Sequence, residues 1–450
     1  MQWMLSAVAL VNQAFPEVEF AHWPQCERCL PHALLCTQWI KQAQIATTAA
    51  MRLLDQLGYY LMARGHYSEA EPFLQQALTL REQQLGTEHT NTATSLYNLA
   101  LLYRLTAKHT EAEGLFRRAL SIREKQLGPT HLDTANSLHG LALLYSEQGK
   151  YPEAETLYQR ALSIQEQQLG PEHPHTVRSL STLARLYEDQ GRYAEAEILA
   201  LRAFTIREQQ LGPEHPNTAN SLHRLSVVYS KQGKYTLAEP LALRALAIRE
   251  QQLGPDHPNI ANSLSNLAGL YISQGKYAQA EPLALRELAL REQRLGSEHP
   301  SIAFSLASLV LLYIRLKRYT EAEPLALREL AIRERQLGPD HPYTALSLDG
   351  LAYLYTNQGR YVEAEPLYLR ALSICEQQLG PEHPSTAIVL HDLGHLYASQ
   401  DKYAEAESLY LRALTIREQH LGPEHPSTAS TLHDLAHLYQ EQGKYYDWSQ

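Results

Sequence analysis

Apolar and polar positions repeat along most of the chain with a period of 42 residues, and the pair Leu-Gly marks this period nine times. Between two marks lie two stretches in which apolar residues recur three and four positions apart, the spacing of one face of an α-helix. Examples are Leu96, Leu99 and Tyr103 in the first stretch, and Ala70 and Ala77 in the second. Each period therefore predicts two amphipathic helices, helix A and helix B.

The residues between these stretches fit helix boundaries. His173 and Pro174 precede a helix A, and proline suits a first helical turn because no backbone donor is lost there. Gly191 is placed in the tight turn to helix B, and Gly170 ends the preceding helix B, where glycine accepts a left-handed conformation at low cost. No helix pair can bury its apolar face alone, so the units must stack. The sequence predicts an all-α fold, an α-solenoid superhelix.

The repeated unit resembles a known family. The pattern L-x2-L-A-x2-Y in helix A and A-E-x-L-x3-A-L in helix B resembles tetratricopeptide repeats, and REQQLGPEHPxTAxSLxxLAxLY resembles the repeats of kinesin light chain. The resemblance covers residues 45–450 as nine full repeats and a tenth half repeat. Leucine replaces the usual tryptophan, and only Gly58 and Gly394 keep the usual glycine. Residues 1–44 show no heptad pattern, so the motor-binding coiled coil of kinesin light chain is not implied.

Residues 1–44 form a predicted non-repeat helical segment, apolar and rich in Trp and Cys. This segment resembles the linker between an NB-ARC-type signalling NTPase module and its tetratricopeptide arm. No G-x4-G-K-[ST] phosphate-binding loop occurs in the chain. The resemblance implies a sensor or regulatory arm whose nucleotide-binding signalling domain is a partner in cis or in trans.

Charge and composition limit the classes of partner and the cellular location that are expected. The net charge of −10 and the isoelectric point near 6.1 argue against nucleic acid, which favours a basic surface. No apolar run reaches the roughly 18 residues of a membrane span, and the N-terminus lacks the basic region of a signal peptide. Four cysteines do not form a secreted disulfide framework, so a cytoplasmic location is expected.

One side of helix A is the predicted binding surface. At about 100° per residue, the positions equivalent to 94, 98, 101 and 105 lie opposite the buried side, and their occupants vary between repeats. By resemblance to tetratricopeptide arrays, this side lines a concave groove. The central repeats place cationic and amide side chains there: Arg178, Arg185, Asn220, Arg224, Asn262 and Asn266. Secondary candidates from the other repeats are Asn98, Asn136, Tyr353, Asp392, His395, Asp434 and His437.

Arginine and asparagine can bind carboxylates and peptide backbone, arginine through its two-pronged guanidinium. The main functional prediction is therefore a non-catalytic scaffold that binds a protein or peptide, expected to be acidic, without a cofactor. The sensor arm described above is the first alternative. Each candidate position also has a simpler interpretation as a solvated surface residue without a ligand.

A third alternative comes from the sequences HDLGH and HDLAH, which place His391 with His395 and His433 with His437 four residues apart on helix A. This spacing resembles the H-E-x-x-H motif of zinc hydrolases. A catalytic zinc needs three protein ligands and a nearby base, and aspartate is one methylene shorter than the glutamate of that motif. A metal-dependent hydrolase is thus the remote alternative, and no metal site is predicted.

Other candidate metal ligands and nucleophiles have structural interpretations. Cys26, Cys29, His32 and Cys36 have the residue types of a Cys3His zinc site, but eleven residues are a tight span for a tetrahedron. They are interpreted as buried apolar cysteines. Cys375 has no evident base. A histidine precedes helix A in nine repeats, and such a recurring polar residue at a helix start predicts a cap.

Overall fold

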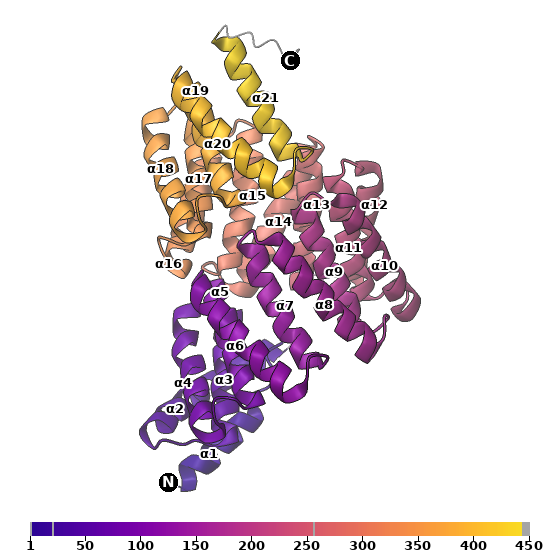
Figure 1. Cartoon of the computed structure of the whole chain (residues 1–450), viewed down its shortest axis with the longest axis vertical. Coiled ribbons are helices and arrows are strands. Elements are labelled where there is room, and N and C mark those ends of the chain that lie inside the picture. The colour runs from indigo at the N-terminus through magenta and orange to yellow at the C-terminus, as the bar shows by residue number, and fades with distance from the viewer. Residues whose placement is uncertain (1, 20–21, 255–256, 443–450) are drawn as a thin grey trace. The chain divides into compact units, whose positions relative to one another are not determined.

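The structure is a computed structural model that describes residues 2–19, 22–254 and 257–442. These residues contain 21 α-helices and no strand, which confirms the predicted all-α fold of stacked helix pairs (Figure 1). The tenth half repeat is predicted to extend to residue 450, but residues 443–450 lie outside the described ones. No helix in the described ranges is long and apolar enough to cross a membrane.

Two helices precede the array, α1 (Gln2–Ala14) and α2 (Trp23–Gln42). The A helices of the ten repeats are α3 (Thr48–Ala63), α5 (Thr90–Leu105), α7 (Leu132–Glu147), α9 (Pro174–Asp189), α11 (Pro216–Lys231), α13 (Pro258–Ser273), α15 (Pro300–Arg315), α17 (Pro342–Asn357), α19 (Pro384–Ala398) and α21 (Pro426–Glu441). The B helices are α4 (Tyr67–Leu85), α6 (His109–Leu127), α8 (Tyr151–Leu169), α10 (Tyr193–Leu211), α12 (Tyr235–Leu253), α14 (Tyr277–Leu295), α16 (Tyr319–Leu337), α18 (Tyr361–Gln378) and α20 (Tyr403–Leu421).

The chain divides into two compact units. The first consists of Met1–Tyr145 and Pro152–Pro171, and the second of Ser146–Tyr151 and Glu172–Gln450. Inside the first unit, α1 and α2 share one apolar core with α3 and α4. The separation of residues 1–44 from residues 45–450 stays a prediction.

The cysteines of α2 contribute to this N-terminal core. Cys26 and Cys36 are fully buried in it, and Cys29 is half-buried with its thiol 3.6 Å from the carbonyl oxygen of Ala14. Burial raises the pKa of the Cys26 and Cys36 thiols. The interpretation of these two residues as buried apolar cysteines is confirmed.

The recurring histidine is a helix cap, as the sequence predicts. At His89 the ring Nδ1 accepts a hydrogen bond of 3.0 Å from the backbone N–H of Asn91. The same bond measures 3.0 to 3.2 Å in the other eight repeats that carry the histidine. The first N–H groups of a helix lack acceptors within the helix, and the ring nitrogen provides an acceptor for one of them.

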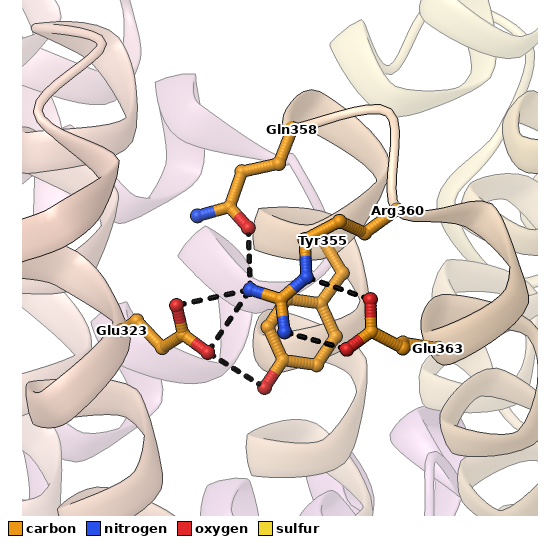
Figure 2. A network of polar contacts seen from close by, with 5 residues as sticks. All are labelled: Glu323, Tyr355, Gln358, Arg360 and Glu363. Atoms are coloured by element: carbon orange, nitrogen blue, oxygen red, sulfur yellow. Dashed lines mark hydrogen bonds and ion pairs between the residues drawn. The ribbon is translucent and has the colours of Figure 1, made fainter.

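Polar clamps join several successive repeats near the turn between helices A and B. Figure 2 shows one, in which Arg360 donates to Glu323 of the preceding helix B and to Glu363 of its own helix. Gln358 accepts another hydrogen bond from this guanidinium at 2.7 Å. The hydroxyl of Tyr355 donates to Glu323 at 3.1 Å, and the guanidinium lies 3.9 Å from the tyrosine ring centroid. The tyrosine of the repeat motif therefore links two repeats as well as packing in the core.

The two retained glycines lie where a side chain would collide with helix B. A Cβ at Gly394 would lie 2.9 Å from the Tyr410 ring, and one at Gly58 would lie 2.6 Å from Leu74. In the repeat where Val310 occupies the same position as Gly394, the facing residue is the smaller Ala326. Alanine occupies this position in other repeats whose facing side chain is also large, as at Ala352 with Tyr368, so the close approach is particular to Gly58 and Gly394.

We expect Gly394→Val to destabilise the array by about 1–3 kcal/mol, because the added methyl groups overpack a filled core. Denaturant unfolding followed by circular dichroism measures the change in unfolding free energy. In a background of Tyr410→Ala, which recreates the pairing of Val310 with Ala326, the same substitution should have a much smaller effect. An equal loss in both backgrounds would contradict the steric explanation.

Candidate functional site

A hollow of about 540 Å³ lies in the second unit, among helices α9 to α14. It is lined by Ser181, Arg207, Asn220, His223, Arg224, Val227, Arg249, Asn259, Asn262, Ser265, Asn266 and Arg291. Four arginines and four asparagines thus converge on a space large enough for a peptide side chain and its backbone.

The structure brings together four of the six residues predicted for the central groove, Asn220, Arg224, Asn262 and Asn266. Arg178 and Arg185 are exposed and do not line the hollow. Arg224 forms an ion pair of 3.1 Å with Glu188, so its charge is compensated inside the protein. Ligand binding by any of these residues remains a prediction.

The hollow also contains arginines that the sequence analysis did not identify. Arg207, Arg249 and Arg291 come from helix B and occupy one position in successive repeats. Their signal in the sequence is an arginine four residues before the Leu of the Leu-Gly pair in most repeats, with Gln165 and Cys375 as exceptions. The sequence predicts the binding surface on helix A only, so this recurrence on helix B does not by itself indicate residues of the groove.

Arg249 is a buried cation without a carboxylate partner among the described residues. The residue is only 3% exposed. Its guanidinium donates hydrogen bonds to Asn220 Oδ1 at 2.7 Å, to Asn259 O at 3.2 Å and to the Ser263 hydroxyl. Its Nε has no hydrogen-bond partner among the described residues. Burial alone lowers the pKa of Arg249 to about 10. A charged group in this environment attracts an anion.

Arg207, one repeat earlier, is likewise a cation without an acidic partner among the described residues. It is half-buried, and its guanidinium donates to the Ser221 hydroxyl at 2.8 Å. Burial lowers the pKa of Arg207 without an opposing contribution from any acid in the described ranges. Two uncompensated cations therefore border one hollow.

Three equivalent arginines of other repeats have acidic partners. Arg291 contacts Glu287 at 2.8 Å, Arg333 contacts Glu329 at 3.2 Å, and Arg81 forms an ion pair with Asp55. The repeat position itself therefore does not require an uncompensated charge.

His223 adds a neutral polar group to the hollow. Burial, together with the neighbouring Arg249 and Arg224, lowers the pKa of His223 to about 3, so the ring is uncharged at neutral pH. Its Nδ1 has no hydrogen-bond partner among the described residues. Arg249 Nε and His223 Nδ1 are thus two buried polar atoms beside the hollow that have no hydrogen-bond partner among the described residues.

The secondary candidates are dispersed. Asn98 hydrogen-bonds the carboxyl of Asp55, Asn136 is exposed, and Tyr353 packs against the core around α17. Asp392 hydrogen-bonds the carboxyl of Asp349 on the preceding helix A. These side chains do not form one site.

His395, Asp434 and His437 line a smaller hollow of about 290 Å³ at α19 to α21. Next to it, His391 Nε2 lies 3.3 Å from Asp434 Oδ2, and burial is the main cause that lowers the pKa of His391 to about 4. In the portion of the chain that the structure describes, no three His, Cys, Asp or Glu side chains gather closely enough to hold a metal ion.

Comparisons with known proteins agree with this architecture. The stacked helix pairs define a helical-repeat protein. The family model for the tetratricopeptide repeat matches residues 47–125, 102–167, 133–209, 186–251, 227–293, 262–332, 301–361, 346–419 and 394–445, so the chain belongs to this family. The comparison with curated proteins gives no match.

Three solved structures illustrate the similarity. A Podosopora anserina kinesin light chain with nearly identical TPR-like repeats is 30% identical, with 46% of this chain and 97% of that chain covered and a TM-score of 0.39. BtubC (BKLC) from P. vanneervenii is 22% identical, with 52% and 92% covered and a TM-score of 0.41. A Rap protein complexed with Competence and Sporulation Factor is 15% identical, with 88% and 99% covered and a TM-score of 0.43.

Proposed function

We propose that this chain is a non-catalytic cytoplasmic scaffold that binds an acidic segment of a partner protein in the hollow of the central repeats. Tetratricopeptide arrays are generally protein-interaction scaffolds, which supports the class of function. The observation that carries the choice of ligand is the pair Arg207 and Arg249. Within the part of the chain that the structure describes, these two cations border the hollow without a carboxylate partner. A ligand carboxylate supplies the missing charge, and hydrogen bonds to charged groups are the strong ones.

The asparagines favour an extended peptide over a small acid. Asn262 accepts a hydrogen bond from Arg291 at 3.3 Å through Oδ1, which leaves its NH2 group to donate to a ligand carbonyl. Asn266 lies one turn further along the same helix and donates to the Ser226 hydroxyl at 3.2 Å, so its Oδ1 is available for a backbone N–H. These groups suit a peptide backbone passing beside the arginines.

A peptide-display selection tests this function. We expect the wild type to enrich acidic peptides, and Arg207→Gln/Arg249→Gln to lose that enrichment while the helical content stays unchanged. Glutamine is the matched substitution, because Gln165 occupies the same position in another repeat. Enrichment should weaken with salt, as pairing of partly exposed charges requires.

Two other outcomes have distinct meanings. Equal enrichment by both proteins would place the ligand elsewhere in the array. Enrichment by neither would favour the second candidate, a sensor arm for a nucleotide-binding signalling domain. That candidate is supported by exposed apolar side chains on α1 and α2, where Trp3 is 59% and Leu10 is 66% exposed.

A further inference from the structure

A row of exposed leucines crosses the B helices of the second unit. One leucine lies at the same position of each helix from α10 to α20, every 42 residues, and each is 37–47% exposed. These residues, here named the leucine stripe, are Leu201, Leu243, Leu285, Leu327, Leu369 and Leu411. Scattered exposed leucines are ordinary, but a continuous apolar row on a folded surface marks an interaction site.

The repeat fold does not require leucine at this position. In the first unit the same position holds Gln75, Arg117 and Gln159. Each of these side chains hydrogen-bonds the glutamate one turn earlier on its own helix, at 2.9, 2.8 and 3.0 Å. The helix pairs form equally well with polar side chains there, so packing inside the repeat does not explain the leucines.

Ion pairs between successive repeats border the stripe on both sides. On the N-terminal side of the leucines, cations at the turns contact glutamates of the preceding helix B, as in Lys234–Glu197 at 3.0 Å, and Figure 2 shows another of these pairs. On the C-terminal side the pairs are Arg244–Glu208, Arg286–Glu250, Arg328–Glu292, Arg370–Glu334 and Arg412–Glu376, at 2.6 to 2.9 Å. An apolar centre with a neutral, polar rim is the anatomy of a protein interface.

We propose that the leucine stripe is a self-association surface on which a second copy of this chain docks. The apolar side chains recur once per repeat, and another array with the same period presents its own leucines at the same separation. The bordering ion pairs carry equal numbers of positive and negative charges. Two chains with a net charge of −10 can therefore bring these faces together without like-charge repulsion at the contact.

The size of the surface fits a stable dimer. Directly packed helices lie about 8–10 Å apart. Within the described ranges, successive B helices are not packed directly on one another, so a row across six of them is at least about 45 Å long. With the two sets of ion pairs, which lie one to two helical turns from the leucines, the band is about 16 Å wide. The resulting area, about 700 Å² per partner, approaches the roughly 800 Å² per partner of a standard specific interface. This surface is on helix B and does not depend on the proposed ligand site.

Sedimentation analysis of the full chain over a range of concentrations tests the proposal. We expect the wild type to form a dimer that persists at high salt, since the contact is mainly apolar. The variant Leu243→Gln/Leu285→Gln/Leu327→Gln/Leu369→Gln should raise the dimer dissociation constant about 100-fold or more. Its circular dichroism spectrum should be unchanged, because glutamine occurs naturally at this position in the first unit.

The matched control is Leu237→Gln/Val362→Gln, which removes two exposed apolar side chains outside the stripe, 49% and 89% exposed. This control should dimerise like the wild type. A wild type that remains monomeric at about 100 µM, far above the micromolar affinities of weak specific complexes, would overturn the proposal. Dimerisation of the folded four-site variant with wild-type affinity would overturn it as well.

Discussion

Arg249→Gln should lower the affinity for an acidic peptide by about 10- to 100-fold while making the free protein more stable. The affinity falls because one or two charge-assisted hydrogen bonds, each contributing about 1.5–3 kcal/mol, are lost. The free protein gains because a buried cation without a counter-ion is removed and a neutral side chain of similar reach replaces it. Fluorescence anisotropy measures the affinity, and thermal unfolding without ligand measures the stability.

Arg333→Gln is the matched control with the opposite expected sign. Arg333 occupies the same position as Arg249, but its guanidinium lies 3.2 Å from the buried carboxylate of Glu329. Removing this partner leaves Glu329 buried and unpaired, which should destabilise the protein by about 3–5 kcal/mol. Peptide affinity measured below the unfolding transition should not change.

The comparison separates a binding role from a structural one. If Arg249 only held α12 against α11 and α13 through Asn220 and Ser263, both variants would be less stable than the wild type. A loss of stability in Arg249→Gln without a loss of peptide affinity would contradict the proposed ligand site. The opposite signs follow from one difference between the two repeats: among the described residues, Arg333 has a carboxylate partner and Arg249 has none.

The period of the sequence was sufficient to predict the helices and their pairing. The apolar spacing within one repeat fixes which face of each helix is buried, and nine near-identical repeats leave little ambiguity in the boundaries. The histidine cap was also predictable, because a cap depends on residues within two positions of each other. Such local features can be derived from sequence alone.

The composition of the site was predictable only for helix A. A helical wheel places Asn220 and Arg224 on the variable side because it treats each helix separately. It does not show that a long arginine side chain from helix B extends to the next helix A, where Arg249 contacts Ser263 fourteen residues later. The recurrence of this Arg–Ser separation was present in the sequence, but its meaning depends on how two helices pack.

Asp392 shows the same limitation at a residue that was predicted for the site but is used in a contact between repeats. Its position on the variable side of α19 predicts a group available to a ligand. In the structure it hydrogen-bonds Asp349, which lies 43 residues earlier on the neighbouring helix A. Contacts between equivalent helices of successive repeats are not visible in the pattern of one helix.

This pair of carboxyl groups leads to a second large effect, on the dependence of stability on pH. Asp349 is buried, and Asp392 lies partly exposed beside it. Burial is the main cause that raises the pKa of both groups, and the charge of Asp392 raises the pKa of Asp349 further. Arg417 opposes the shift at Asp392, whereas Asp434 adds to it. The raised pKa values favour a form in which the two carboxyl groups share a proton, with Asp349 as the donor to Asp392.

A raised carboxyl pKa in the folded state makes folding favour the protonated form. Its contribution to stability is therefore complete below the ordinary carboxyl pKa of about 4 and is lost as the pH rises through the higher folded values. Each pKa unit of the shift corresponds to about 1.4 kcal/mol. The pair should consequently contribute a fall in the unfolding free energy between about pH 4 and neutrality, as should buried acids such as Glu329, whose pKa burial also raises. His223 and His391 contribute in the opposite direction, because their pKa values are lowered to about 3 and about 4 in the folded state.

Asp392→Asn isolates the contribution of the pair. The asparagine amide can donate to the Asp349 carboxylate without a bound proton. The variant should therefore be more stable than the wild type at about pH 8 and no more stable at about pH 4. The dependence of its unfolding free energy on pH should be smaller by about one proton. Denaturant unfolding at several pH values measures the difference, with Asp133→Asn as the control at a carboxylate that is 51% exposed. A difference between Asp392→Asn and the wild type that is constant across this range would show that no proton is shared between the two groups. A difference that grows with pH would support a shared proton between Asp349 and Asp392. Buried charge in these C-terminal repeats would then be neutralised by protonation, whereas the central repeats are proposed to use a ligand carboxylate.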